Sequence, residues 1–152
     1  MAKPLIVCRD LSIIYNKGKS NEFKALQGVN TDIFEGEYII LFGPSGCGKS
    51  TLMYSIQGSL PPGEGTLLIK GDDIYSYPPS ERVYFQRYVM GIIFQSFNLI
   101  PQYTVLENIE VPLHYRPGAP AVNSVDRERC HELALRVGLQ DRMDHRPYQL
   151  SG

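Results

Sequence analysis

The chain has 152 residues, a formal net charge of −1, 43% hydrophobic and 20% charged residues, which is ordinary for one globular domain. A charge this close to zero argues against a general nucleic-acid binder, since such proteins are usually strongly basic. Apolar runs are too short to span a bilayer and the N-terminus lacks an apolar signal core, so we expect a cytoplasmic protein that can still dock peripherally on a membrane protein.

The N-terminal third is rich in β-forming residues. Apolar and β-branched stretches predict strands, and polar stretches with glycine predict the connections between them. In chain order the patterns predict strand residues at Leu5–Cys8 and Leu11–Tyr15, interrupted by Arg9-Asp10, then a loop at Asn16–Lys24, a strand at Val29–Phe34 and a turn at Glu35–Glu37.

The next segments alternate between strand and helix patterns. The apolar run Tyr38–Phe42 predicts a short buried strand, and Lys49–Gln57 predicts a helix that ends at Gly58. Further strands are predicted at Gly65–Lys70 and Val89–Phe94. This alternation is typical of an α/β fold.

The C-terminal part is predicted to be helical. Arg116–Asn123 contains two prolines and a glycine and is interpreted as a linker, after which Ser124 can cap a helix that runs to Val137. One face of this helix is expected to be core, and it consists of Cys130, Leu133, Ala134 and Val137.

Scattered cysteines and histidines argue against a metal site. No CxxC spacing occurs, so we expect reduced thiols rather than a zinc site or a redox pair. The histidines are interpreted as surface or packing residues. The residues concerned are Cys8, Cys47, Cys130, His114, His131 and His145.

The strongest motif is a phosphate-binding loop of the pattern G-x-x-x-x-G-K-[ST]. Its glycines let the backbone curl so that N–H groups point at phosphate oxygens, and the loop opens into the positively polarised N-terminus of a helix. Lys49 supplies a charge to the β- and γ-phosphates, the Ser50 hydroxyl can bind Mg²⁺, and Thr51 can reach the α-phosphate side. The motif is Gly43-Pro44-Ser45-Gly46-Cys47-Gly48-Lys49-Ser50-Thr51.

A phosphate-binding loop alone does not distinguish kinases, GTPases and transport ATPases. Small nucleotide kinases usually open with this loop, whereas here about 40 residues of β-rich sequence precede it. The guanine-reading pattern N-K-x-D has no match, since Asn16-Lys17-Gly18-Lys19 lacks the aspartate and precedes the loop.

The sequence resembles the nucleotide-binding domains of ABC transporters over nearly its whole length. It is most similar to the branch that powers lipoprotein release, macrolide export and antimicrobial-peptide efflux. The phosphate-binding loop carries this resemblance together with Ala25-Leu26-Gln27-Gly28-Val29, Gly91-Ile92-Ile93-Phe94-Gln95-Ser96-Phe97-Asn98-Leu99-Ile100-Pro101 and Thr104-Val105-Leu106-Glu107-Asn108-Ile109.

The resemblance implies roles for individual residues. Tyr15 matches the aromatic residue that stacks on adenine, which suits a flat apolar base. Gln95 matches the glutamine of the Q-loop, whose amide can bind Mg²⁺ and hold the attacking water, so Lys49 and Gln95 are the candidate catalytic residues. The segment Ser96–Pro101 would move between ATP-bound and free states and contact the membrane subunit.

Leu150-Ser151-Gly152 matches the first three residues of the family's LSGGQ signature, which grips the γ-phosphate bound to the opposite subunit of a dimer. The family's apolar-Asp-Glu strand and switch histidine have no counterpart. Leu67–Asp73 is the nearest substitute, but a lysine and a glycine separate its apolar run from its acids. We therefore expect one partial domain over residues 1–152, truncated within the signature.

The expected fold is an α/β P-loop NTPase of the ABC ATPase type. Residues 1–100 would hold an N-terminal antiparallel β-subdomain and an incomplete parallel core sheet, and residues 101–152 would begin a helical subdomain. The expected function is an ATP-binding subunit that uses ATP and Mg²⁺, pairs with a second ATP-binding subunit and a transmembrane permease, and binds no nucleic acid. Alternatives are a soluble non-transport ABC ATPase and a nucleotide-binding interaction module without hydrolysis.

Overall fold

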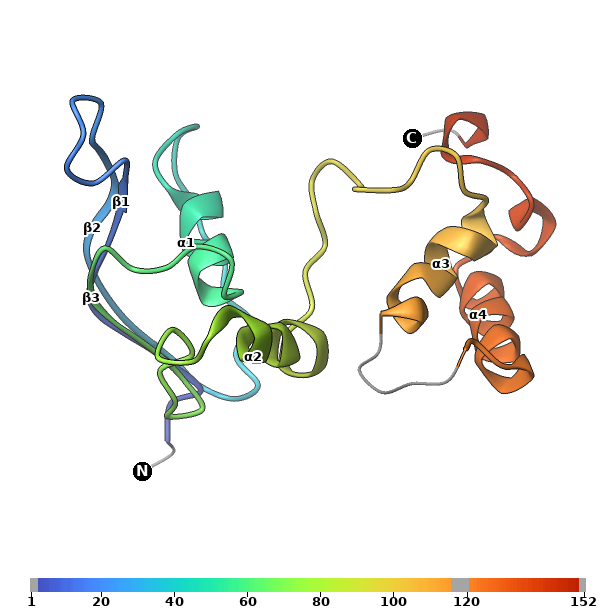
Figure 1. Cartoon of the computed structure of the whole chain (residues 1–152), viewed down its shortest axis with the longest axis horizontal. Coiled ribbons are helices and arrows are strands. Elements are labelled where there is room, and N and C mark those ends of the chain that lie inside the picture. Colours follow the sequence, from blue (N-terminus) through green and yellow to red (C-terminus); the bar gives the residue numbers. More distant parts are fainter. Residues whose placement is uncertain (1–2, 116–120, 151–152) are drawn as a thin grey trace. The chain divides into compact units, whose positions relative to one another are not determined.

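The computed structural model describes residues 3–115 and 121–150, and the chain forms two compact units, Met1–Ile92 and Ile93–Gly152 (Figure 1). Part of the expected linker Arg116–Asn123, and Ser151 and Gly152 of the expected signature, lie outside the described residues. The first unit contains β1 (Ile6–Tyr15), β2 (Phe23–Ile33), α1 (Lys49–Ile56), β3 (Glu64–Ile69), α2 (Pro79–Tyr84) and the π-helix η1 (Phe85–Val89). The second contains α3 (Val105–His114), α4 (Ser124–Arg136) and the 3₁₀-helices η2 (Gln140–Arg142) and η3 (Pro147–Gln149).

An antiparallel three-stranded sheet of order β2-β1-β3 forms the first unit's framework. The middle strand β1 pairs Ile13 with Leu26 of β2 and Cys8 with Leu67 of β3. The two stretches expected at Leu5–Cys8 and Leu11–Tyr15 are thus one continuous strand, since the polar residues between them lie in a bulge. β2 is longer than the expected strand at its N-terminal end and begins inside the expected loop.

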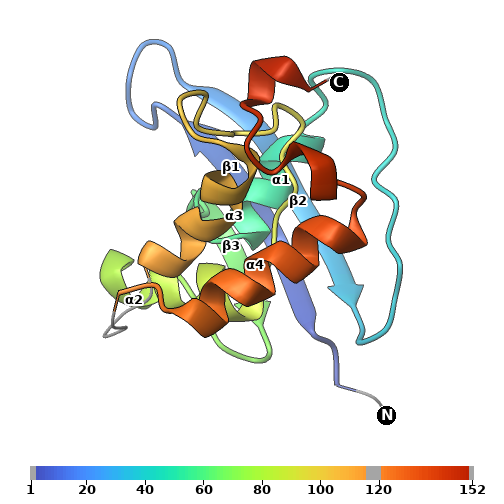
Figure 2. The same ribbon diagram turned by 90° about the vertical axis from the view of Figure 1, so that its right-hand side faces the viewer.

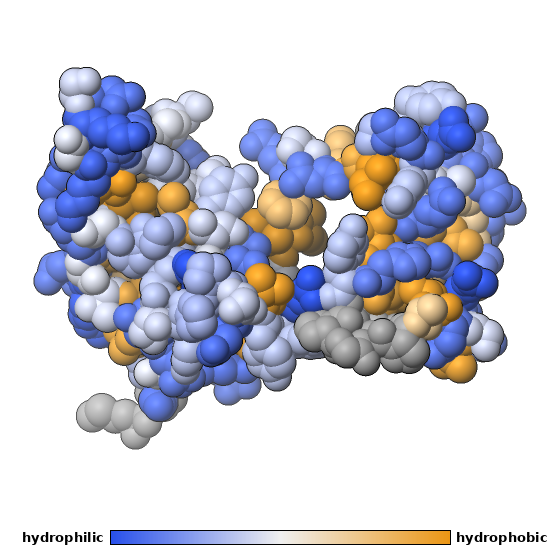
Figure 3. Space-filling model, in the orientation of Figure 1, coloured by the Kyte–Doolittle hydropathy of each residue, from blue (hydrophilic) through white to orange (hydrophobic). Residues whose placement is uncertain are grey.

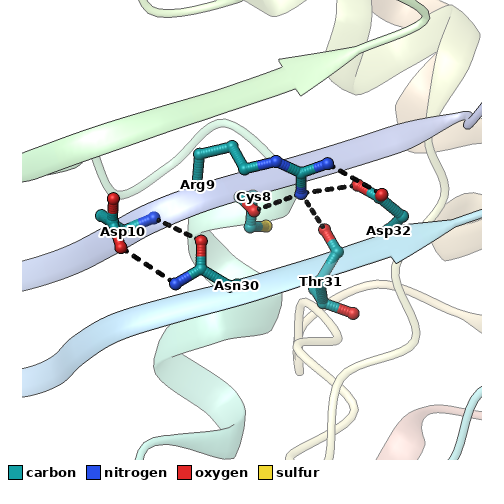
Figure 4. A network of polar contacts seen from close by, with 6 residues as sticks. All are labelled: Cys8, Arg9, Asp10, Asn30, Thr31 and Asp32. Carbon is teal, nitrogen blue, oxygen red and sulfur yellow. Dashed lines mark hydrogen bonds and ion pairs between the residues drawn. The ribbon is translucent and has the colours of Figure 1, made fainter.

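A polar network holds this bulge in place (Figure 4). Asp10 has a left-handed backbone conformation with φ of 48°. Its N–H donates to the Asn30 side-chain oxygen at 3.0 Å, and the Asn30 amide donates back to the Asp10 carboxylate at 3.0 Å. Beside them the Arg9 guanidinium makes a bidentate contact with the Asp32 carboxylate, with nitrogen–oxygen distances of 2.7 and 2.8 Å. These paired contacts connect β1 to β2 where the regular ladder is interrupted.

The core of the first unit lies between the sheet and α1 (Figure 2). Leu52 of α1 belongs to the same buried cluster as Leu11 and Ile13 of β1. The other buried members of this cluster are Cys8, Leu26 and Leu67. Helix α1 is therefore positioned by apolar contacts with the sheet, and it begins at Lys49 as the sequence predicted.

The two expected core strands are not strands within the described residues. Tyr38–Phe42 leads from β2 toward α1 as a trace without regular structure (Figure 2). Val89–Phe94 includes only the last residue of η1 and an irregular segment after it. A strand requires a hydrogen-bonded neighbour, and neither segment finds one in the described parts of the chain. The predictions of these two strands are therefore wrong for this structure.

The second unit is built from α3 and α4, each of which begins with a capping box. Thr104 accepts from the Glu107 N–H at 3.2 Å, and the Thr104 N–H donates to the Glu107 carboxylate at 2.7 Å. The cap of α4 is Asn123 rather than the expected Ser124, which is the first helical residue. On the face expected to be core, Cys130 and Ala134 are buried, whereas Leu133 and Val137 are exposed.

Much apolar surface remains in contact with solvent. Figure 3 shows hydrophobic residues gathered at the surface of each unit between areas of polar residues. The most exposed large side chains are Tyr38, Phe42 and Ile93, at 89%, 99% and 97%. No helix in the described ranges is long and apolar enough to cross a membrane.

The Arg9–Asp32 contact predicts how the sheet responds to acid. The hydrogen bond from Arg9 lowers the pKa of Asp32. A carboxyl whose pKa is lower in the folded state stabilises that state above its unfolded pKa of about 3.9, and this contribution is lost as pH falls through the folded value. We expect urea unfolding, followed by β-sheet circular dichroism at pH 7 and at about pH 2, to show a larger acid-induced loss of stability in wild type than in Asp32→Asn.

Asp144→Asn is the matched control, because this exposed carboxyl lies in the second unit. It should retain the acid response of the wild-type sheet. If Asp32→Asn lost as much stability in acid as wild type does, the contribution assigned to the Arg9–Asp32 pair would be contradicted.

Candidate functional site

The phosphate-binding loop, Gly43 to Thr51, connects the irregular segment Tyr38–Phe42 to α1. Gly48 is the N-cap of α1, with a left-handed conformation at φ of 95°, and its carbonyl accepts the first helical hydrogen bond from Leu52 at 2.9 Å. The N–H groups of the first turn have no acceptor within the helix and carry its positive partial charge. The loop therefore ends at a helix terminus suited to an anion.

Glycine at position 48 is required by packing as well as by conformation. A Cβ atom here would lie 2.6 Å from Cδ2 of Leu26 and 2.7 Å from the carbonyl oxygen of Ala25. Both neighbours belong to β2, so the end of the loop lies directly against the sheet. The sequence motif predicts the glycine, but only the structure shows that β2 excludes any side chain there.

Lys49 is held within its own loop. Its ammonium group donates to the carbonyl oxygens of Gly43 and Pro44, both at 2.8 Å, and lies 3.6 Å from the Cys47 sulfur. Pro44 also accepts from the Cys47 N–H at 3.4 Å, which closes a turn. These contacts place the positive charge of Lys49 beside the loop backbone. A phosphate group there would be attracted both by this charge and by the backbone N–H groups.

The remaining loop residues are accessible from solvent. Ser50 is exposed in the first turn of α1, Thr51 beside it is half-buried, and Pro44, Ser45, Gly46 and Cys47 are exposed. Across residues 3–115 and 121–150, no cluster of three or more His, Cys, Asp or Glu side chains could hold a metal ion. A divalent cation at this loop would therefore need ligands other than a protein carboxylate cluster.

Tyr15, the expected adenine-stacking residue, is the last residue of β1 and pairs with Phe23 of β2. Its side chain is 39% exposed, so part of the ring is open to solvent. Tyr15 and the phosphate-binding loop both belong to the first unit.

Gln95 belongs to the second unit, where it is exposed in a turn. Two residues after it, Phe97 and Asn98 are both in the left-handed region, at φ of 42° and 49°. The Asn98 N–H donates to the carbonyl of Ser96, and the Ser96 hydroxyl contacts the Asn98 side-chain oxygen at 3.1 Å. A bulky residue in this conformation costs roughly 1–2 kcal/mol, so the turn after Gln95 stores strain.

Asn108 holds the backbone of Ile100–Thr104, the segment that follows this turn, by hydrogen bonds. Its side-chain oxygen accepts from the Ile100 N–H at 2.8 Å, and its amide donates to the carbonyls of Ile100, Tyr103 and Thr104 at 3.1, 3.2 and 2.9 Å. One side chain on α3 thus contacts four backbone groups of the preceding loop, with its two N–H donors shared among three carbonyl oxygens. The sequence motif around Asn108 does not by itself predict this role, because the four backbone groups come close to the side chain only in the folded structure.

Two pockets lie beside the segment Leu99–Thr104. Ile100 and Tyr103 contribute to a polar pocket of about 320 Å³ together with Glu107, Glu110, Val111, His114 and Tyr115. Leu99 contributes to an apolar pocket of about 260 Å³ that also includes Leu150, the first residue of the expected signature. Leu150 is extended, follows η3 and lines this pocket.

The three thiols have different surroundings. Burial raises the pKa of the Cys8 and Cys130 thiols, and both belong to apolar cores. Cys47 is exposed in the phosphate-binding loop. All three are free cysteines.

Comparison with known proteins agrees with this arrangement. A family model described as "ABC transporter" matches residues 26–152. An uncharacterized ABC transporter ATP-binding protein of Thermotoga maritima is 42% identical over 143 residues, which are 94% of this chain and 59% of that protein. The macrolide export ATP-binding/permease protein MacB of Nitrosomonas europaea is 36% identical over 149 residues, 98% of this chain and 22% of MacB.

A solved structure is similar as well. It is a dimeric, post-hydrolysis state of an ATP-binding cassette bound to ADP and Pi, with a TM-score of 0.84 and 33% identity over 96% of this chain and 63% of that one. The chain spans about three-fifths of the Thermotoga relative and of this cassette. The loop geometry, the family match and these relatives lead to one conclusion: the chain belongs to the ATP-binding cassette family of ABC transporters.

Proposed function

We propose that the chain binds MgATP at Gly43–Thr51 as part of an ABC-type export complex. The observation that carries this proposal is the position of Lys49, whose ammonium lies within hydrogen-bonding distance of the loop backbone at the N-terminus of α1. Binding of a triphosphate would exchange the Gly43 and Pro44 carbonyls for phosphate oxygens, which are charged acceptors and bind an ammonium more strongly. Tyr15 would stack on the adenine.

Mg²⁺ would be held mainly by the nucleotide. Ser50 offers a hydroxyl oxygen, a ligand type that Mg²⁺ accepts, and Gln95 offers an amide oxygen. Because this ion usually retains several waters and binds phosphate oxygens, a site with few protein ligands suits its coordination. The bound ion would neutralise phosphate charge.

The partner proposed for the second unit is a transmembrane permease. The support is the strained turn after Gln95, the fastening of Ile100–Thr104 by Asn108, and the polar pocket beside that segment. A firmly held surface next to a strained turn suits a contact that passes nucleotide state to a partner. The complex would lie at the cytoplasmic face of a membrane and include a second ATP-binding subunit, as the related cassette is dimeric.

Lys49 is tested by removing its charge. Lys49→Ala removes the charged donor, and charged hydrogen bonds contribute about 1.5–3 kcal/mol, so the dissociation constant of a fluorescent ATP analogue should rise at least roughly tenfold. Lys19→Ala, which removes an exposed lysine from a loop of the same unit, is the control and should bind like wild type. Equal affinities of wild type and Lys49→Ala would refute the proposed site.

Tyr15 is tested separately because it should recognise the base and not the phosphates. Tyr15→Ala should weaken ATP binding by about 1–2 kcal/mol, which lies within the range of base–aromatic stacking, while Tyr15→Phe should bind normally. Binding of inorganic triphosphate, which has no base, should be the same in all three proteins. An ATP affinity unaffected by Tyr15→Ala would leave the ring with a packing role only.

Turnover is tested separately from binding. Phosphoryl transfer needs a positioned metal, a positioned water and charge stabilisation. The 152 residues contain Lys49, Ser50 and Gln95 but no apolar strand followed directly by Asp-Glu. We expect purified chain to release phosphate from MgATP no faster than Lys49→Ala does, and steady release well above that variant would contradict this expectation.

A further inference from the structure

The end of the β1–β2 ladder carries two accessible aromatic rings. Tyr15 of β1 and Phe23 of β2 are cross-strand partners, and their side chains are 39% and 60% exposed. Residues directly opposite each other in an antiparallel pair point to the same side of the sheet, with Cβ atoms about 4.5–5.5 Å apart. Phe23 therefore lies beside the ring that is proposed to stack on adenine.

A bulge in β2 decides to which side of the sheet Phe23 points. Ile13 pairs with Leu26, and the next residue of β1 pairs with Lys24, so Ala25 is an extra residue of β2. An extra residue reverses the alternation of side chains in the part of the strand beyond it. Without this bulge Lys24, and not Phe23, would share the side of Leu26.

The side that Phe23 shares is the one that faces α1. Ile13 and Leu26 belong to the same buried cluster as Leu52 of α1. Tyr15 follows Ile13 by two residues in β1 and therefore points to the same side. Its partner Phe23 does so too, and the two rings thus continue the face that packs against α1 beyond the buried cluster.

The two rings also lie close to the phosphate-binding loop. A Cβ atom at Gly48, the N-cap of α1, would lie 2.7 Å from the carbonyl oxygen of Ala25, the extra residue of the bulge. Phe23 precedes Ala25 by two residues, which is roughly 7 Å along an extended strand. The bulge that turns Phe23 toward the α1 side therefore also touches the end of the loop at which phosphates are proposed to bind.

The lysines nearest to the rings are engaged elsewhere. The Lys24 ammonium lies 3.4 Å from the Glu64 carboxylate of β3, and the Lys17 ammonium donates to the carbonyl oxygen of Gly63 at 2.9 Å. These contacts draw both charges toward β3 and the residue before it. The pair of rings is left as a mainly apolar, flat surface, which suits the face of a base more than its hydrogen-bonding edge.

We propose that Phe23 is a second base-contacting residue, so that Tyr15 and Phe23 form one two-ring platform for a purine. This role rests on the proposed nucleotide site. A base held between two rings needs a separation of roughly 7 Å, twice the carbon–carbon contact distance of about 3.5 Å. Direct cross-strand partners are closer than that, at about 4.5–5.5 Å between Cβ atoms. The base therefore lies across both rings and not between them.

A platform of two adjacent rings favours a base with two fused rings. A purine reaches both side chains, whereas the single ring of a pyrimidine covers only one of them. Stacking energy depends on the contact between flat surfaces and little on base identity. Phe23 should therefore contribute to the binding of ATP and much less to the binding of CTP, which carries the same triphosphate.

Equilibrium binding of ATP, CTP and inorganic triphosphate to the 152-residue chain tests this role. Phe23→Ala should raise the dissociation constant of ATP at least roughly fivefold, that of CTP less than about twofold, and that of triphosphate not at all. Lys24→Ala is the matched control, since it truncates the adjacent residue of β2, which points to the opposite side of the sheet. It should bind all three ligands like wild type.

A fluorescent reporter tests the contact itself. The chain contains no tryptophan, so Phe23→Trp introduces a single indole at this position. This variant should keep its ATP affinity, and ATP should quench its fluorescence because the base stacks on the indole, whereas inorganic triphosphate should not. Tyr84→Trp places the indole at a similarly exposed aromatic residue of α2, 58% exposed in wild type, and its fluorescence should not respond to ATP.

The outcomes separate the platform from the nucleotide site as a whole. The platform is overturned if Phe23→Ala binds ATP like wild type, if it loses ATP and CTP affinity equally, or if ATP leaves the fluorescence of Phe23→Trp unchanged. An equal loss for both nucleotides would show that Phe23 only supports the hairpin. Failure of the nucleotide site would instead appear as unchanged triphosphate binding in Lys49→Ala, whereas weakened binding there with a silent Phe23→Ala would overturn the platform alone.

Discussion

Backbone hydrogen bonding decides which apolar segments of this chain become strands. β1 has a hydrogen-bonded strand along both edges, β2 on one side and β3 on the other, and at its bulge the Asp10 N–H donates to the Asn30 side chain. Tyr38–Phe42 is more apolar than β1 but has no strand beside it in the described residues. A run of β-forming residues is therefore insufficient for a strand, because the ladder requires a second chain segment at the right distance.

The geometry of the phosphate-binding loop depends on this sheet. Leu52 anchors α1 in the core beneath β1, and Gly48 lies so close to Leu26 that no side chain fits between the loop and β2. The position of the helix N-terminus is thus set by packing, while Lys49 is oriented by carbonyls of the loop itself. The C-terminal end of the loop is therefore held by the sheet, and the loop is closed on itself by Lys49.

The second unit is held locally instead. Asn108 satisfies backbone groups from Ile100 to Thr104 with one side chain, and capping boxes begin both of its α-helices. Polar contacts over short sequence distances therefore shape the surface after Gln95, where the backbone is strained at Phe97. The backbone directly after the strained residue Phe97 is thus held by hydrogen bonds to one side chain, Asn108.

The sequence by itself determined the family, the phosphate-binding loop and the start of α1, because these depend on residue types at fixed local spacing such as Gly48 before Lys49. Local patterns also located β1 and β3 to within a few residues. Only the tertiary structure decided that Tyr38–Phe42 would not be a strand and that Asn108 would fasten a loop. Both outcomes depend on which groups lie close in space, and the spacing of residues along the chain carries no information about that.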